Sequence, residues 1–130
     1  MTPAGHYLLV ALGGAIGSLL RVLASQALAQ RFGVGFPYGT FAVNVTGSFL
    51  IGVAAGVLAP RLSLAPGAWA LLVPGFLGGY TTFSAFEMET LSLLRGGAPG
   101  RALLYVGASV VIGLFACWTG LRLASRLTAE

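Results

Sequence analysis

Four long apolar runs, joined only by short connections, constrain this chain more than any other feature. They lie at roughly residues 7–29, 38–59, 67–94 and 102–122, and Arg, Pro and Gly separate them. A helix needs about 20 mostly apolar residues to cross a bilayer, so each run is long enough to do so. We therefore expect an all-α membrane protein with four transmembrane helices, in which residues 1–130 form a single domain.

The composition fits a bilayer environment and excludes several kinds of site. Charged residues make up 8% of the chain, against about 25% in a typical soluble domain. The chain contains no Asp, and His6 and Cys117 are its only His and Cys. An intrachain disulfide, a His/Cys zinc site and a Ser-His-Asp triad are therefore excluded, and we do not expect an enzyme. The seven Arg residues are spread along the chain, so the net charge of +4 does not indicate a nucleic-acid partner.

The third apolar run is interrupted in mid-membrane. Its two parts, residues 68–77 and 83–94, are each too short to cross, and Gly78-Gly79-Tyr80-Thr81-Thr82 lies between them. Gly permits a positive φ and Thr is a modest helix former, so this stretch predicts a break in the helix. A break frees backbone groups that protein, water or an ion must satisfy. A plain kink is the alternative, but broken helices at the midplane favour an ion site.

Polar side chains form stripes on two of the apolar runs. Thr40, Asn44 and Ser48 are spaced by four residues, as are Tyr105 and Ser109, so each set lies on one helix face. Hydrogen bonds between helices would explain any one of these residues. The three polar residues of the second run together slightly favour a hydrated pathway, because polar groups in a bilayer are costly.

Aromatic and charged residues follow the break. Phe83 and Phe86 share one face, and the positive edges of their rings would tolerate a small anion, although packing is the commoner role. Glu87 and Glu89 occupy the last turns of the span, where a carboxylate either reaches the interface or faces an aqueous vestibule. Arg21 is the only cation well inside a span, and it either attracts anions or extends to the interface.

Small residues on the first two runs are spaced for close helix packing. Gly13 and Gly17, and likewise Gly52 and Gly56, follow the GxxxG pattern. In lipid, such spacing lets two helix backbones approach closely. Apolar helices rich in Gly and Ala also produce this spacing by chance.

The Arg residues specify the orientation of the chain poorly. With four crossings, one membrane side carries Arg61, Arg122 and Arg126, and the other carries Arg31, Arg95 and Arg101, with Arg21 near that end. This near-balance gives almost no positive-inside bias. One hypothesis is that the chain inserts both ways up and pairs as an antiparallel dimer. The other is a single orientation that cellular factors set.

Several of these residues together resemble the fluoride ion channel family, known as Fluc or CrcB. The resemblance is carried by Gly13-Gly14-Ala15-Ile16-Gly17 with Arg21, by Pro37-Tyr38-Gly39-Thr40 with Asn44, by Gly75-Phe76-Leu77-Gly78-Gly79 running into Thr81-Thr82-Phe83-Ser84 with Phe86, and by Glu89. Tyr105 and Ser109 extend it into the fourth run. Two departures are Ala85, where the family frequently has Thr, and the extra acid Glu87.

The resemblance implies a passive fluoride channel of the cell (inner) membrane, which lowers cytoplasmic fluoride. It implies an antiparallel, dual-topology homodimer with two pores. It also implies a structural sodium ion (Na+) on the dimer axis, held by the backbone carbonyls of Gly78 and Thr81. The implied fluoride pore consists of Thr40, Asn44, Thr82, Phe83, Ser84, Phe86, Glu89, Tyr105 and Ser109, with Arg21 as a vestibule charge.

Two other functions are compatible with four short spans. A small proton-coupled drug exporter of dual topology needs an acid inside the membrane, and the first run contains none. A non-transporting assembly subunit would need only the packing glycines. That reading leaves the Asn44 stripe and the broken third run without a purpose.

Overall fold

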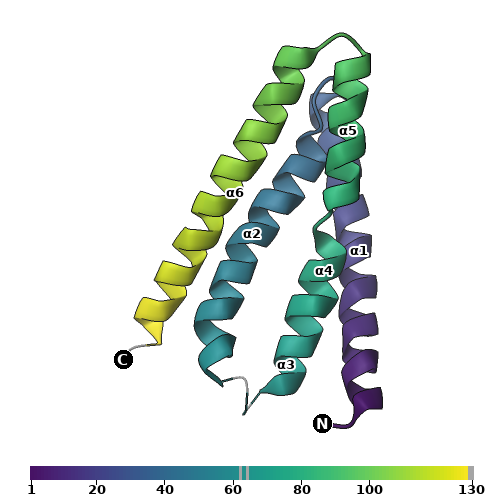
Figure 1. Cartoon of the computed structure of the whole chain (residues 1–130). Helices are drawn as coiled ribbons and strands as arrows, with labels where there is room; N and C mark the ends of the chain where they lie inside the picture. The colour runs from purple at the N-terminus through teal and green to yellow at the C-terminus, as the bar shows by residue number, and fades with distance from the viewer. Residues whose placement is uncertain (62, 64, 129–130) are drawn as a thin grey trace.

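The computed structural model describes residues 1–61, 63 and 65–128, and this part of the chain is helical throughout its regular structure (Figure 1). The helices are α1 (Pro3–Phe32), α2 (Tyr38–Leu58), η1 (Ala59–Arg61), α3 (Pro66–Ala70), the π-helical η2 (Leu71–Leu77), α4 (Gly78–Tyr80), α5 (Phe83–Arg95) and α6 (Pro99–Leu127). Leu62, Leu64 and the last two residues of the predicted domain lie outside the described part.

Three helices of the described residues are long and apolar enough to cross a membrane, namely Pro3–Phe32, Tyr38–Arg61 and Pro99–Leu127. The third apolar run folds instead into a succession of shorter elements, α3, η2, α4 and α5. The first and last helices extend beyond the predicted 7–29 and 102–122. Pro3 and Pro99 explain the early starts, because proline suits the first turn of a helix, where its missing N–H has no intrahelical partner.

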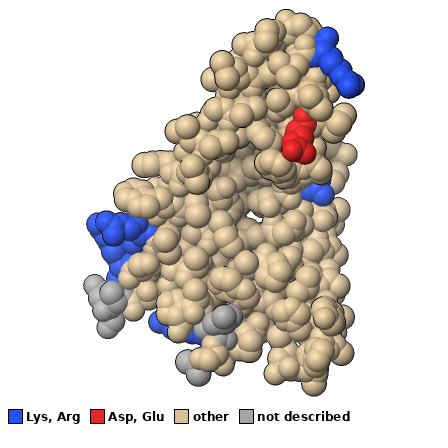
Figure 2. Space-filling view, in the orientation of Figure 1, with Lys and Arg blue, Asp and Glu red and all other residues tan. Residues whose placement is uncertain are grey.

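The exterior of the bundle is apolar along the crossings. Leu103 and Phe115 on α6 are 76% and 65% exposed, and Leu19 on α1 is 61% exposed. Figure 2 shows a face that is almost entirely uncharged, with Arg and Glu side chains in isolated patches. Large apolar side chains in contact with the surroundings require lipid or another protein chain there. The chain is a multi-pass membrane protein.

Helix α1 packs directly against the π-helical stretch η2. A Cβ at Gly13 would overlap the Leu71 carbonyl, and one at Gly17 would overlap the Phe76 carbonyl. The two backbones are therefore in contact where a larger residue would separate them. The packing role predicted for this glycine pair is confirmed, and it fixes the first half of the broken span against α1.

Helices α2 and α6 make the second close backbone contact, and they run side by side in Figure 1. A Cβ at Gly52 would overlap the Cys117 carbonyl, and one at Gly56 would lie 2.6 Å from the Ala124 Cβ. The packing role of the second glycine pair is confirmed as well. This contact sets the rotation of α2 and α6 that turns their polar stripes inward.

The helix break occupies fewer residues than the sequence predicts. Gly78–Tyr80 is still helical, and the chain is extended only at Thr81 (φ −88°, ψ 159°) and Thr82 (φ −151°, ψ 125°). The expectation that Gly78 and Gly79 open the helix through positive φ is wrong. In the described residues, positive φ occurs only at Gly33 and Gly97, both in connections.

Gly79 has a packing role instead. A Cβ at Gly79 would overlap the Gly14 carbonyl of α1. One turn earlier, Pro74 lies inside η2 and has no amide hydrogen to donate. The loss of that hydrogen bond explains why the helix widens to π geometry here. The span is thus weakened over two turns before it breaks at the threonines.

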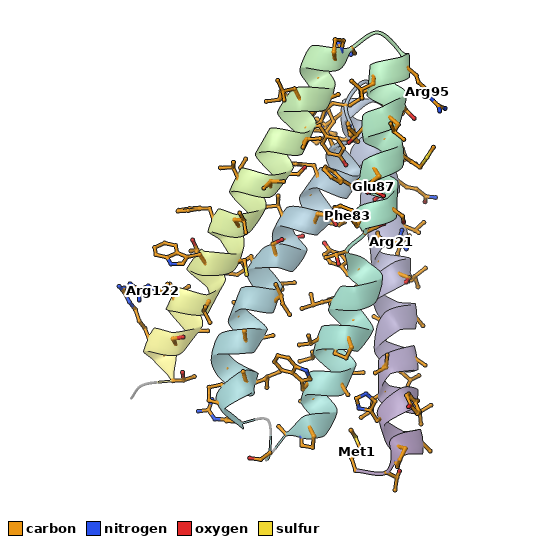
Figure 3. All side chains as sticks on the ribbon, in the orientation of Figure 1. Met1, Arg21, Phe83, Glu87, Arg95 and Arg122 are labelled. Atoms are coloured by element: carbon orange, nitrogen blue, oxygen red, sulfur yellow. The ribbon has the colours of Figure 1, made fainter. Side chains whose placement is uncertain are left out.

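Both described ends of the chain lie at one end of the bundle, with the end of α2 and the start of α3, and the α1–α2 and α5–α6 connections lie at the opposite end (Figure 1). This arrangement agrees with four crossings. Arg95 ends α5, close to the start of α6, and Arg122 lies near the other end of α6 (Figure 3).

Candidate functional site

Asn44 of α2 pairs with the backbone of the break. Its Nδ2 donates to the Thr82 carbonyl at 2.9 Å, and its Oδ1 accepts from the Thr82 amide at 2.8 Å. One side chain thus satisfies both backbone groups of an extended residue between two helices. Each such bond contributes about 0.5–1.5 kcal/mol net, and an unpaired buried backbone group costs about 1–3 kcal/mol. Asn44 thus supplies the hydrogen-bond partners that the broken helix does not.

This pairing changes the partners of two backbone carbonyls. In a continuous helix the Thr82 amide would bond to the Gly78 carbonyl, but it donates to Asn44 instead. The Ala85 amide, which would bond to the Thr81 carbonyl, donates to the Thr82 hydroxyl at 3.3 Å as a helix N-cap. The carbonyls of Gly78 and Thr81 therefore lose their helical donors. These are the two carbonyls that the sequence resemblance assigns to sodium.

Arg21 lies against the break (Figure 3). Its Nε donates to the Gly79 carbonyl at 3.0 Å, and the Ser18 hydroxyl donates to the same oxygen at 3.4 Å. The guanidinium thus satisfies a carbonyl that the broken helix leaves without its own donor. Arg21 lines neither cavity described below, so its role as a vestibule charge stays a prediction. Sequence reasoning missed Ser18, although its spacing of three residues from Arg21 places both on one face.

A carboxylate of α5 joins three helices. Glu89 Oε1 accepts from the Thr40 hydroxyl of α2 at 2.7 Å, and Oε2 accepts from the Tyr105 hydroxyl of α6 at 2.7 Å. Thr40 and Tyr105 are buried, at 5% and 0% exposure. Because both donors are neutral, the cluster satisfies the carboxylate's hydrogen bonds without neutralising its charge. The structure brings together three predicted residues from three separate helices.

Aromatic rings line the space between this cluster and the break. The ring centroids of Phe83 and Phe86 are 5.6 Å apart with an interplanar angle of 38°, and Phe86 lies 5.0 Å from Tyr105 at 57°. The Phe36 ring also lies near Tyr105, with centroids 5.4 Å apart and an interplanar angle of 77°. Phe83 begins α5 (Figure 3) and is 70% exposed. Sequence reasoning missed Phe36, because no periodic pattern includes this connection residue.

A cavity of about 440 Å³ lies beside the break. The predicted pore residues Asn44, Thr82, Phe83, Phe86 and Ser109 line it, together with Ser48, Gly78 and Thr81. Figure 2 shows the molecule hollowed near mid-height. The Ser109 hydroxyl is buried without a hydrogen-bond partner among the described residues. The cavity therefore offers at least one donor that no protein group uses.

A second cavity, of about 570 Å³, lies where α2 and α6 begin. Thr40 and Glu89 line it, together with residues of the α1–α2 and α5–α6 connections. The remaining predicted residue, Ser84, is exposed, and its Oγ lies 3.4 Å from the Thr82 Oγ. We call this second cavity the outer cavity. The predicted site residues thus extend from the outer cavity to the break.

Comparison with known proteins identifies the family. The family described as CrcB-like protein, Camphor Resistance (CrcB), matches residues 8–121. The chain belongs to the CrcB-like family. The family resemblance inferred from the sequence is confirmed.

Curated relatives cover nearly the whole chain. A protein of Acidobacterium capsulatum named fluoride-specific ion channel FluC is 51% identical over 124 residues, covering 95% of this chain and 98% of its own length. Proteins of the same name from Thermus thermophilus and Rhizobium meliloti are 49% and 47% identical, covering 94% and 91% of this chain and 97% and 94% of their own lengths. These names describe ion channels rather than enzymes.

Proposed function

We propose that this chain is a fluoride-specific channel that lets fluoride leave the cell passively and so lowers its cytoplasmic concentration. The observation that carries the proposal is the continuous series of site groups between the two cavities. The series begins with the hydrogen bonds that Thr40 and Tyr105 donate to Glu89. It continues with Phe86, whose ring contacts Tyr105, and ends at the helix break, where Asn44 is hydrogen-bonded to the Thr82 backbone. The relatives named fluoride-specific ion channels support the same function.

The chemistry of the cavity beside the break suits a small, strongly hydrated anion. A pore for such an ion must replace its water with hydrogen-bond donors. The unpartnered Ser109 hydroxyl is one donor, and the Thr82 hydroxyl, 3.4 Å from the Ser84 Oγ, is a second hydroxyl of the lining. The positive ring edges of Phe83 and Phe86 tolerate an anion without binding it tightly. Weak, distributed contacts allow the ion to leave as readily as it enters.

The working unit in this proposal is an antiparallel homodimer of dual topology with two pores. Phe83 is 70% exposed, so a single chain leaves one side of the aromatic pair uncovered. The Arg residues are almost evenly divided between the two ends, which allows insertion in both orientations. A two-fold pairing of inverted copies would cover the same face on both chains.

The break suits a structural sodium ion shared by two copies. The described residues hold no group of three or more His, Cys, Asp or Glu side chains for a metal. The carbonyls of Gly78 and Thr81 have lost their helical donors, and carbonyl oxygens are suitable ligands for a hard cation. One chain supplies two such oxygens, so a second copy is needed to complete the ligand shell. Gly78 is exposed, as this sharing requires.

The two alternative functions receive less support. In a proton-coupled exporter, an acid must exchange its proton with substrate, whereas both oxygens of Glu89 are held by hydroxyl donors from two other helices. An assembly subunit would not need the donor-lined cavity. The curated relatives carry the name of neither class.

Efflux from liposomes tests the proposal. We expect the reconstituted protein to release fluoride, measured with a fluoride electrode, and to retain chloride under the same gradient. Phe83→Ile and Phe86→Ile should each slow fluoride release while the oligomer on size-exclusion chromatography is unchanged. Absence of fluoride release, or equal chloride release, would overturn the proposed function. If both variants release fluoride at the unaltered rate, the aromatic pair has no role in the pore.

A further inference from the structure

The outer cavity contains a cation that the site described above does not use. Its lining includes Gln26 and Tyr38 from α1 and α2, Ser92 from α5, and Arg101 from the first turn of α6. Among the described residues that line it, Arg101 carries the only positive charge and Glu89 the only negative charge. The cavity's volume of about 570 Å³ is ample for a hydrated ion.

Arg101 is anchored at this cavity. Its Nη1 donates to the Gly35 carbonyl at 3.3 Å, in the connection between α1 and α2. The bond joins residues 66 positions apart in sequence. The two other Arg at this end are placed differently. Arg31 lies over the Phe32 ring at 5.7 Å, and Arg95 ends α5 and extends away from the bundle in Figure 3.

An anion that approaches Glu89 needs such a cation. The hydroxyls of Thr40 and Tyr105 leave the negative charge of the Glu89 carboxylate in place. An uncompensated carboxylate at a pore entrance repels anions, and a cation in the same cavity offsets that repulsion. The amino ends of α2 and α6 lie at the cavity and have the same favourable sign.

We propose that Arg101 is the entry residue of the channel, which concentrates fluoride in the outer cavity and compensates the charge of Glu89. This inference rests on the proposed fluoride conduction. In this role the charge of Arg101 matters more than its hydrogen bond to Gly35. Its contribution is a rate effect on ion entry, and salt screens it.

Three variants in liposomes separate the charge from the bond. Arg101→Gln keeps an N–H donor and loses the charge, Arg101→Lys keeps the charge, and Arg95→Gln removes an exposed charge at the same end. At ~10 mM ionic strength, where the Debye length is ~30 Å, we expect R101Q to slow fluoride release about two- to tenfold. At ~1 M of an impermeant salt, where the length is ~3 Å, the difference should vanish. R101K and R95Q should release fluoride like the unaltered protein.

The outcomes distinguish this inference from the proposed function. If the unaltered protein releases no fluoride, the proposed function fails. If it does, and R101Q matches it at low salt, only the entry role of Arg101 is overturned. An equal loss in R101Q and R101K that persists at high salt would also overturn it, because the bond to Gly35 would then be what matters.

Discussion

Replacing Asn44 by Ala should destabilise the protein far more than its size suggests. The change removes two hydrogen bonds, of 2.9 and 2.8 Å, and leaves both backbone groups of Thr82 without protein partners. Two lost bonds of about 0.5–1.5 kcal/mol and two unpaired groups of about 1–3 kcal/mol bracket the cost. Because both bonds are only partly buried, water recovers some of that energy. We expect a loss of about 2–4 kcal/mol.

Unfolding in mixed micelles with increasing SDS measures this loss, followed by the fluorescence of Trp69 and Trp118 at fixed protein concentration. Ser48→Ala is the matched control, because Ser48 lies one turn further along the same stripe and lines the same cavity. S48A should change the free energy of unfolding by no more than about 0.5 kcal/mol. If N44A and S48A have equal stability, Asn44 does not brace the break, and the reasoning is refuted.

Three further predictions follow from the same contacts. Tyr105→Phe removes one donor from Glu89, and should lower the free energy of unfolding by about 1.5–3 kcal/mol because the acceptor is charged; a loss under 0.5 kcal/mol would contradict the cluster. Gly17→Ala should cost about 1–3 kcal/mol, because its Cβ meets the Phe76 carbonyl, whereas Gly107→Ala, with nothing within 4 Å of its Cβ, should cost nothing; equal effects would deny the close contact. Replacing sodium by N-methylglucamine, a cation too large for the break, should reduce fluoride release and dimer stability together, and indifference of both would count against the sodium site.

The sequence predicts the membrane crossings well because hydrophobicity alone determines them. Three of the four apolar runs form helices long and apolar enough to cross a membrane, and the two glycine pairs mark backbone contacts, since in lipid only small residues allow them. The position of the break is less predictable. Gly78 and Gly79 are equally suited to open a helix or to approach a neighbour, and the contact of Gly79 with Gly14 decides the question only in three dimensions.

The site is predictable residue by residue but not as an arrangement. Periodicity places Thr40 and Tyr105 on helix faces, yet their meeting at Glu89 depends on the rotation that the α2–α6 contact sets. The bond between Arg21 and the Gly79 carbonyl depends likewise on how α1 packs on the broken span. From the sequence alone, Arg101 cannot be distinguished from the other Arg residues near the helix ends. Its hydrogen bond to the Gly35 carbonyl depends on how the α1–α2 connection packs against the start of α6.

The reversal potential of the fluoride current in a planar bilayer tests passive fluoride conduction most directly. With a tenfold fluoride gradient and equal chloride and pH on both sides, the reversal potential should follow fluoride, at about 59 mV for a monovalent ion. Imposing a chloride or pH gradient in addition should leave it unchanged. A reversal potential that moves with chloride, or one that moves with pH as proton coupling requires, would contradict a passive fluoride-specific channel.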